Sequence, residues 1–248
     1  MLMTTDAHPT QTETTYRACH TDRLQPYRFI HKALRALMFR TLQQAASLDA
    51  CDTQERQALT AAVEELLQTC SDHLSHENTF FHVPLRERAP RAVMAFDDDH
   101  EEHVRDIERL RRQLGLVAQG GPAARQHAYL LYLELTRFVS ENLAHMADEE
   151  SLLTTALWQH FSDEEIDGMG QRLKATFTPQ EGAYYLRWMA RGLNHAELVE
   201  LMGGARAAMP AAVFAGACDM LRYELPAARW TRLARALGLP PVPGLVNA

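Results

Sequence analysis

The chain has 248 residues, of which 46% are hydrophobic and 23% are charged, and its formal net charge is -7. This is the composition of an ordinary globular protein that is long enough to bury a core, and the negative charge argues against nucleic acid as a partner. No run approaches the roughly 20 apolar residues of a membrane span, so we also expect no contact with a membrane.

The N-terminal segment and the cysteines indicate the compartment. Residues 1–20 are polar and rich in threonine, and they lack the basic and apolar segments of a signal peptide. We expect a disordered tail here and a cytoplasmic protein. The four cysteines, Cys19, Cys51, Cys70 and Cys218, show no Cys-x-x-Cys spacing, which argues against a disulfide framework or a zinc knuckle.

The first half of the chain predicts long helices. Apolar residues recur with helical spacing nearly everywhere, and no stretch alternates as a strand does, so we predict an all-α protein. The first helix is expected over residues 24–47. The second is expected to start at a capping box of Asp52 and Glu55 and to run towards residue 81, with Pro84 and the following segment 86–92 ending it.

Two further long helices complete the predicted bundle. The third is expected from the acidic cluster 97–99, because carboxylates are favourable at a helix N-terminus, to Gly115. The glycines and proline of residues 120–122 predict a loop, and a fourth helix follows to about residue 158. Four long helices with short connections predict an up-and-down antiparallel four-helix bundle over residues 21–160.

The remaining residues, 161–248, predict a smaller helical C-terminal region. Its expected helix starts are Ser162 with Glu165, Thr178 with Glu181, Asn194 with Glu197, and the two prolines Pro210 and Pro226. Packing into a core is the first interpretation of its apolar residues. A homodimer or partner surface is the alternative.

Histidine is concentrated in the bundle region, since 11 of the 12 lie in the first 160 residues. Two of them begin the same pattern, His-x-x-x-Glu: His73 with Glu77, and His145 with Glu149. Residues four apart lie on one face of a helix, so each pair can direct an imidazole and a carboxylate to one point. Each pair could supply half of a metal site.

The other two predicted bundle helices each carry one histidine in a comparable place, His31 and His100. Six ligands exceed the four of a structural zinc site. Imidazoles favour metals such as Fe(II) over calcium and magnesium, and two carboxylates can bridge a pair of ions. The pattern predicts a centre with two Fe ions, for which Zn or Mn could substitute.

This order of ligands on four successive helices resembles the hemerythrin-like HHE cation-binding domain family. The resemblance covers about residues 20–160 and implies a non-haem di-iron site of the bacterial type inside the bundle. Glu77 and Glu149 would bridge the ions and the histidines would be terminal ligands. The resemblance also implies an open coordination position for O2 or a related small diatomic ligand.

The chain departs from the oxygen-carrying hemerythrins on the third helix, where residue 104 is Val and the second histidine is His103. Those proteins also have an aspartate five residues after the fourth-helix histidine, where this chain has Glu150. We therefore expect a six-ligand site with His103 as a seventh candidate. The predicted metal ligands are His31, His73, Glu77, His100, His103, His145 and Glu149.

Neighbouring polar residues receive other interpretations. Glu150 is the rival of Glu149, and the repeat register favours Glu149. Asp99 and Glu102 are expected to be solvated charges at a helix start, although either could hydrogen-bond a ligand histidine. His82, which precedes Val83 and Pro84, is expected to be a helix-end residue.

The predicted function is to bind or sense O2, NO or peroxide, or to handle iron, in the manner of a stress-response protein. Because no nucleophile, catalytic dyad or phosphate loop accompanies the site, we favour a role without catalysis. One alternative is a di-iron redox enzyme that consumes peroxide or NO or repairs iron centres. The other is a sensor or interaction protein whose output is the C-terminal region.

Overall fold

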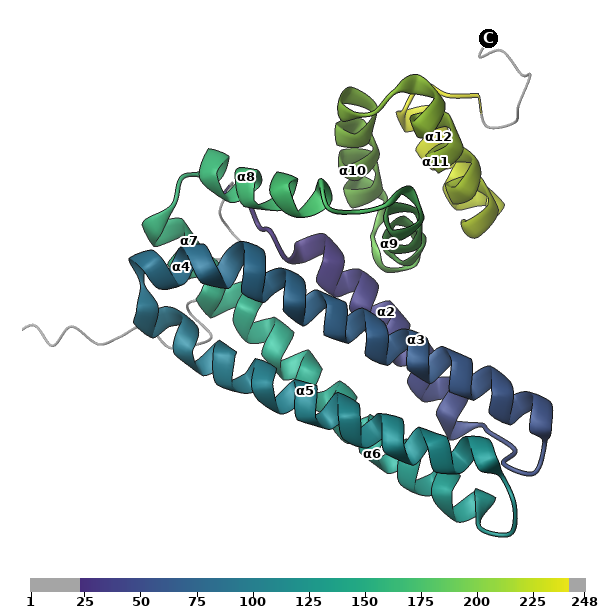
Figure 1. Cartoon of the computed structure of the whole chain (residues 1–248). Coiled ribbons are helices and arrows are strands. Elements are labelled where there is room, and N and C mark those ends of the chain that lie inside the picture. The colour runs from purple at the N-terminus through teal and green to yellow at the C-terminus, as the bar shows by residue number, and fades with distance from the viewer. Residues whose placement is uncertain (1–22, 241–248) are drawn as a thin grey trace, which may run out of the picture. The chain divides into compact units, whose positions relative to one another are not determined.

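The structure is a computed structural model, and it describes residues 23–240. All regular elements of this range are helical, with a bundle over residues 28–160 and smaller helices after it (Figure 1). The all-α prediction is confirmed. The tail expected at residues 1–20 lies outside the described residues. In the described range, the helices are too short or too polar to cross a membrane.

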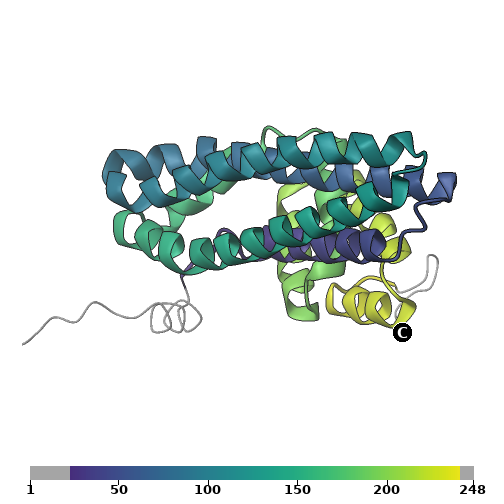
Figure 2. The ribbon, with the colours of Figure 1, turned by 90° about the horizontal axis from the view of Figure 1, so that it is seen from below.

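The bundle region contains long helices and two π-helical segments. In chain order they are α2 (Arg28–Ala46), α3 (Thr53–Glu77), η1 (Asn78–His82), α4 (Val83–Arg88), α5 (Pro90–Gln119), α6 (Ala124–Asp148), η2 (Glu149–Leu153) and α7 (Thr154–His160), where η marks a π-helix. Figures 1 and 2 show α5 running beside α3 and beside α6 and antiparallel to both, as the prediction of an up-and-down bundle requires.

Shorter helices follow: α8 (Asp163–Lys174), α9 (Pro179–Gly192), α10 (His195–Ala208), α11 (Ala211–Glu224) and α12 (Ala227–Ala236). The three predicted capping boxes, at Ser162, Thr178 and Asn194, are all formed. The two prolines are the N-cap residues of α11 and α12. Local sequence therefore determines where these helices begin.

The described residues form two compact units. Residues 23–28 and 41–175 form the first, and residues 29–40 and 176–240 form the second. Helix α8 belongs to the first unit, because Ile166 and Met169 are buried in its core. The domain boundary expected at residue 161 stays a prediction.

The second unit has its own apolar core, in which Met202, Leu221 and Leu233 are fully buried. A close backbone approach in this unit involves Gly192. A Cβ atom on this residue would lie 2.4 Å from the backbone oxygen of Lys32, a separation that atoms do not tolerate. Glycine is therefore required where α9 meets this part of α2.

The second predicted helix does not end at Pro84. The N–H of Val83 donates to the carbonyl of Asn78, five residues back, and Pro84 lies in the first turn of α4. A proline ring clashes with the carbonyl four residues before it in a regular α-helix, and the wider π turn avoids this clash. The chain therefore remains helical to Arg88.

The predicted capping box before α3 is only half formed. The Asp52 carboxylate accepts hydrogen bonds from the backbone N–H groups of Gln54 and Glu55, at 2.7 and 2.9 Å. The Glu55 carboxylate accepts instead from the N–H of Asp49, at 2.8 Å. Asp52 thus caps the helix, but the reciprocal hydrogen bond of a capping box is missing because the Glu55 carboxylate accepts from Asp49 and not from Asp52.

Both predicted ends of the third helix are wrong. Helix α5 starts at Pro90, which suits a first turn because it has no N–H to satisfy. It continues through Gly115, where a glycine costs only about 1 kcal/mol. It ends before Gly120, whose φ of 70° lies in the region that favours glycine. The acidic cluster 97–99 therefore lies inside the helix, beside the histidines.

Candidate metal centre

Both His-x-x-x-Glu pairs lie where a long helix changes into a π segment. His73 and Glu77 end α3 immediately before η1, and His145 lies in the last turn of α6. Glu149 is the first residue of η2. Such π segments are rare and are frequently found at functional sites. The repeat seen in sequence is therefore also a repeat in backbone geometry.

Four of the predicted ligands form one compact cluster. An oxygen or nitrogen atom from each of Glu77, His100, His145 and Glu149 lies within 4.8 Å of one from every other. His145 Nε2 is 3.3 Å from Glu149 Oε1, and the Nε2 atoms of His100 and His145 are 3.0 Å apart. His100 Nε2 lies 3.7 Å from Glu77 Oε2 and 3.6 Å from Glu149 Oε1.

The chemistry of this donor set fits a metal ion. None of the four residues is more than 6% exposed. Burying two carboxylates together is costly unless a positive charge compensates them, and a divalent cation would do so. Imidazole nitrogen with carboxylate oxygen is a combination that suits iron, manganese and zinc.

The two other histidines of the six-ligand set are also buried. His73 Nε2 is 3.1 Å from Glu77 Oε1, so the first repeat brings its imidazole and carboxylate together. His31 is fully buried on α2, in the second unit. Glu150, the rival of Glu149, is only half-buried and lies outside the cluster, so the geometry agrees with the register argument.

Acceptors outside the cluster orient two of the imidazoles. His100 Nδ1 is 2.9 Å from Asn78 Oδ1, and His145 Nδ1 is 3.3 Å from Asp99 Oδ2. A ligand histidine commonly donates its second N–H in this way, which leaves the other nitrogen free to bind a metal. Asp99 therefore contacts the site, whereas the sequence favoured a solvated charge.

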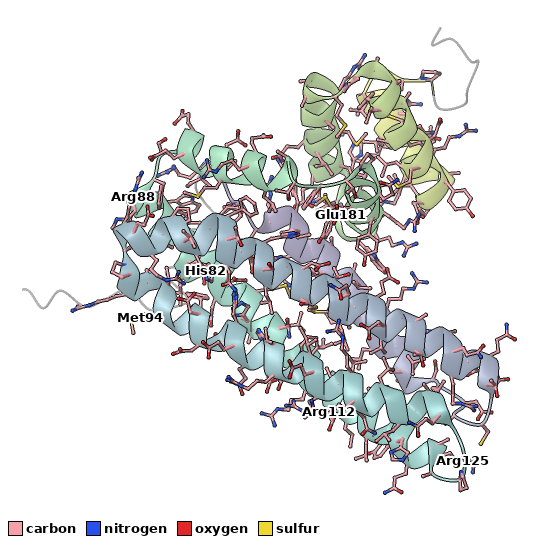
Figure 3. All side chains as sticks on the ribbon, in the orientation of Figure 1. His82, Arg88, Met94, Arg112, Arg125 and Glu181 are labelled. Carbon is pink, nitrogen blue, oxygen red and sulfur yellow. The ribbon has the colours of Figure 1, made fainter. Side chains whose placement is uncertain are left out.

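The expectation for His82 is wrong. Its side chain is fully buried, and its ring stacks on that of His100 with centroids 4.7 Å apart (Figure 3 labels the residue). Its Nδ1 is 3.0 Å from Asp97 Oδ1, and the other oxygen of Asp97 accepts from Arg86 at 2.6 Å. Burial and the neighbouring His100 lower the pKa of His82 to about 4. The sequence feature that could have indicated this is that His82 follows Glu77 by five residues. Two residues with that spacing lie on one face of the helix only in a π turn.

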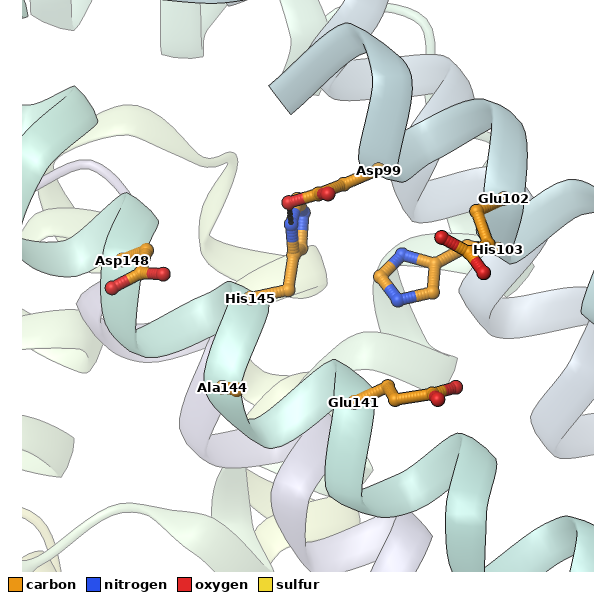
Figure 4. A pocket seen from close by; sticks show the side chains of 7 residues that line it. All are labelled: Asp99, Glu102, His103, Glu141, Ala144, His145 and Asp148. Carbon is orange, nitrogen blue, oxygen red and sulfur yellow. Dashed lines mark hydrogen bonds and ion pairs between the residues drawn. The ribbon is translucent and has the colours of Figure 1, made fainter. Parts of the chain in front are cut away.

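His103 lies beside the cluster and not within it. It is 5% exposed, and its ring meets that of His145 edge-on with centroids 4.9 Å apart. Burial and the neighbouring His145 lower its pKa to about 4. The residue lines a cavity of about 230 Å³ whose other lining residues are Asp99, Glu102, Glu141, Ala144, His145 and Asp148 (Figure 4).

The buried carboxylates change the titration of their neighbours. Tyr27 is 2% exposed, and burial together with the charges of Glu77 and Glu149 raises its pKa well above the usual value, so the phenol keeps its proton. Burial lowers the pKa of His145, but Glu149 and the other nearby carboxylates outweigh this and raise it to about 9. A metal ion must therefore displace a proton from His145 to bind there.

The sequence was compared with known proteins. A family model described as the hemerythrin HHE cation binding domain matches residues 26–157. No curated protein and no solved structure matches the chain. The matched range covers all but the last three residues of the bundle region and includes all seven predicted ligands.

Proposed function

The chain belongs to the hemerythrin HHE cation-binding family, and from this premise we propose that it holds a carboxylate-bridged pair of iron ions. We propose further that this centre binds or senses O2, NO or peroxide, or serves in handling iron. The observation that carries the proposal is the buried cluster of Glu77, His100, His145 and Glu149. Zn and Mn are substitutes that the same donors would accept.

We assign Glu77 and Glu149 as the bridging carboxylates and His31, His73, His100 and His145 as terminal ligands. His31 follows Tyr27 by four residues, so the two side chains leave one face of the chain in helical geometry. The charges of Glu77 and Glu149 act on the Tyr27 hydroxyl. This supports a place for His31 in the same ligand set.

When bound, the iron pair would supply redox chemistry and a coordination position for a small ligand. The protein side chains would orient the histidines and exclude water. Phe81, Met146 and Leu153 are buried, with exposed fractions of 6, 2 and 1%, and the Phe96 ring lies 5.9 Å from that of His145. An apolar, closed surrounding of this kind favours ligands of two or three atoms over organic substrates.

We favour a role without catalysis, in which the cluster residues act as ligands and Asn78 and Asp99 as hydrogen-bond partners of the histidines. The enzymatic alternative is turnover of peroxide or NO at the same centre. The sensor alternative is supported by the second unit, which has a separate apolar core. In that case the C-terminal helices would carry the output, through a homodimer or a protein partner.

The first experiment is elemental analysis of protein purified anaerobically from iron-replete cells. We expect about two iron ions per chain, as in other dinuclear sites. His73→Ala and Glu149→Ala should lose iron, whereas His127→Ala, on α6 outside the cluster, should keep it. Circular dichroism must show that all three variants are folded. Full iron in both ligand variants, or one zinc per chain in the wild type, would contradict the assignment.

The enzymatic and binding roles differ in turnover. Iron-loaded protein that only binds or senses a ligand should react with peroxide or NO once per centre. Continued consumption under steady-state conditions would establish the enzymatic alternative. The measurement is the concentration of peroxide or NO over time at several protein concentrations.

A further inference from the structure

The cavity beside His103 is strongly acidic. Its lining residues come from α5 and α6, and four of them are carboxylates: Asp99, Glu102, Glu141 and Asp148. Among the described residues that line it, none is Lys or Arg. A concave surface with one sign of charge raises the local concentration of oppositely charged ions. The cavity is thus suited to attract cations.

His103 gives this cavity a specific donor. Its ring points from α5 toward His145 and into the space between Asp99 and Glu141 (Figure 4). The His103 residue is only 5% exposed, and its Nδ1 has no hydrogen-bond partner among the described residues. Leaving a buried polar nitrogen unsatisfied costs free energy. A bound cation would satisfy it.

The Glu141 carboxylate, which is now paired with Arg137, is available to bind a cation instead. It accepts a hydrogen bond from Arg137 at 2.7 Å, but the Arg137 side chain is 70% exposed. Exposed ion pairs contribute little to stability, so Glu141 can leave Arg137 for a divalent cation at little cost. Oxygen donors together with one imidazole suit Fe(II) and Mn(II).

One imidazole separates the cavity from the buried cluster. Asp99 Oδ2, on the cavity side, is 3.3 Å from His145 Nδ1. The other nitrogen of the same ring, Nε2, is 3.3 Å from Glu149 Oε1 in the cluster. The side chain of His145 alone therefore lies between an ion held beside Asp99 and the Glu149 carboxylate.

We propose that Asp99, Glu102, His103 and Glu141 form an outer site for a divalent transition-metal ion, from which the ion passes to the buried cluster. The delivery role rests on the proposed function, whereas the outer site itself does not. His103 is in this assignment a ligand of the outer ion.

The test is Mn(II) binding, followed by the electron paramagnetic resonance signal of the free ion. The wild type should bind ions tightly in the buried cluster and one further ion more weakly in the outer site. These are called the tight ions and the weaker ion. The double variant Glu102→Gln/Glu141→Gln should lose the weaker ion, keep the tight ones and fill them about tenfold more slowly. The matched control is Glu101→Gln/Glu108→Gln, which removes the same charge from exposed positions of α5 and should behave as wild type.

Two further variants separate the possible failures. His103→Gln should weaken the outer ion without changing the number of tight ions. Glu149→Ala should lose tight ions and keep the weaker one. Tight ions without a weaker ion in the wild type would overturn the outer site and leave the proposed function intact. Equal slowing in both double variants would overturn the delivery role, and a weaker ion without tight ions would overturn the proposed function alone.

Discussion

The two His-x-x-x-Glu repeats share a backbone distortion that arises from different local chemistry. In the first repeat, η1 precedes Pro84, whose ring a regular α-helix would not accommodate. The second repeat has no proline there. Instead, the Thr154 hydroxyl donates to the carbonyl of Glu149, five residues back, at 2.8 Å.

The two π segments therefore share a position beside the glutamates, although different local residues support them. Two unrelated devices produce the same widening next to the two glutamates. In a π turn, residues five apart come to one face, which places His82 after Glu77 and Thr154 after Glu149. The repeats therefore match in the positions of their histidine and glutamate but not in the residues that support them.

The largest effect should come from the glutamates themselves. Glu77→Gln and Glu149→Gln should each weaken metal binding by roughly 100-fold or more, since loss of supporting residues alone costs 10- to 100-fold. The metal-free Glu149→Gln protein should be less stable than metal-free wild type by about 1 kcal/mol or more, because the carboxylate pairs with the protonated His145. Thermal unfolding of each variant with and without metal measures both the change in metal binding and the change in stability.

Glu108→Gln, at an exposed position of α5, is the control for a lost carboxylate and should change neither quantity. A glutamate variant with wild-type metal affinity would show that the two repeats are not equivalent ligands. A metal-free Glu149→Gln protein as stable as wild type would mean that Glu149 and His145 do not form an ion pair without metal.

A smaller effect should distinguish the supporting residues. Asn78→Ala removes the acceptor of the His100 N–H and should weaken metal binding about tenfold. Glu150 is the residue at the matched place in the second repeat, and Glu150→Ala should leave the affinity unchanged because it lies outside the cluster. Isothermal titration calorimetry with Mn(II) measures the metal affinity of both variants. Equal losses of affinity would refute the idea that the two repeats are supported by different residues.

The smallest effect should come from the hydroxyl of η2. Thr154→Val should lower the free energy of unfolding by about 1 kcal/mol, since one buried hydrogen bond is lost. Thr155→Val is the control, because its hydroxyl bonds the carbonyl of Ser151 four residues back, at 2.6 Å, on the half-buried side of the helix. Urea unfolding of the metal-free protein measures both, and equal losses would mean that the Thr154 bond has no special role in the π segment.

Helical periodicity in the sequence predicted the fold class and the long helices, and the repeat predicted the buried residues Glu77 and Glu149. Periodicity assumes 3.6 residues per turn, so it could not find η1, η2 or the place of His82. The role of Asp99 was missed because the start of α5 was set at the acidic cluster. Local caps, which depend on three or four adjacent residues, were predicted well after residue 160.

Each π segment also bears on how the chain should be aligned with its relatives. A turn closed over five residues contains one residue more than an α turn, and one residue corresponds to about 100° of rotation. The part of the helix that follows Glu77, and likewise the part that follows Glu149, is rotated as though a single residue had been inserted. Relatives with regular helices at these places should show a one-residue gap beside each glutamate, and the two gaps should mark where this site was built into an ordinary helix.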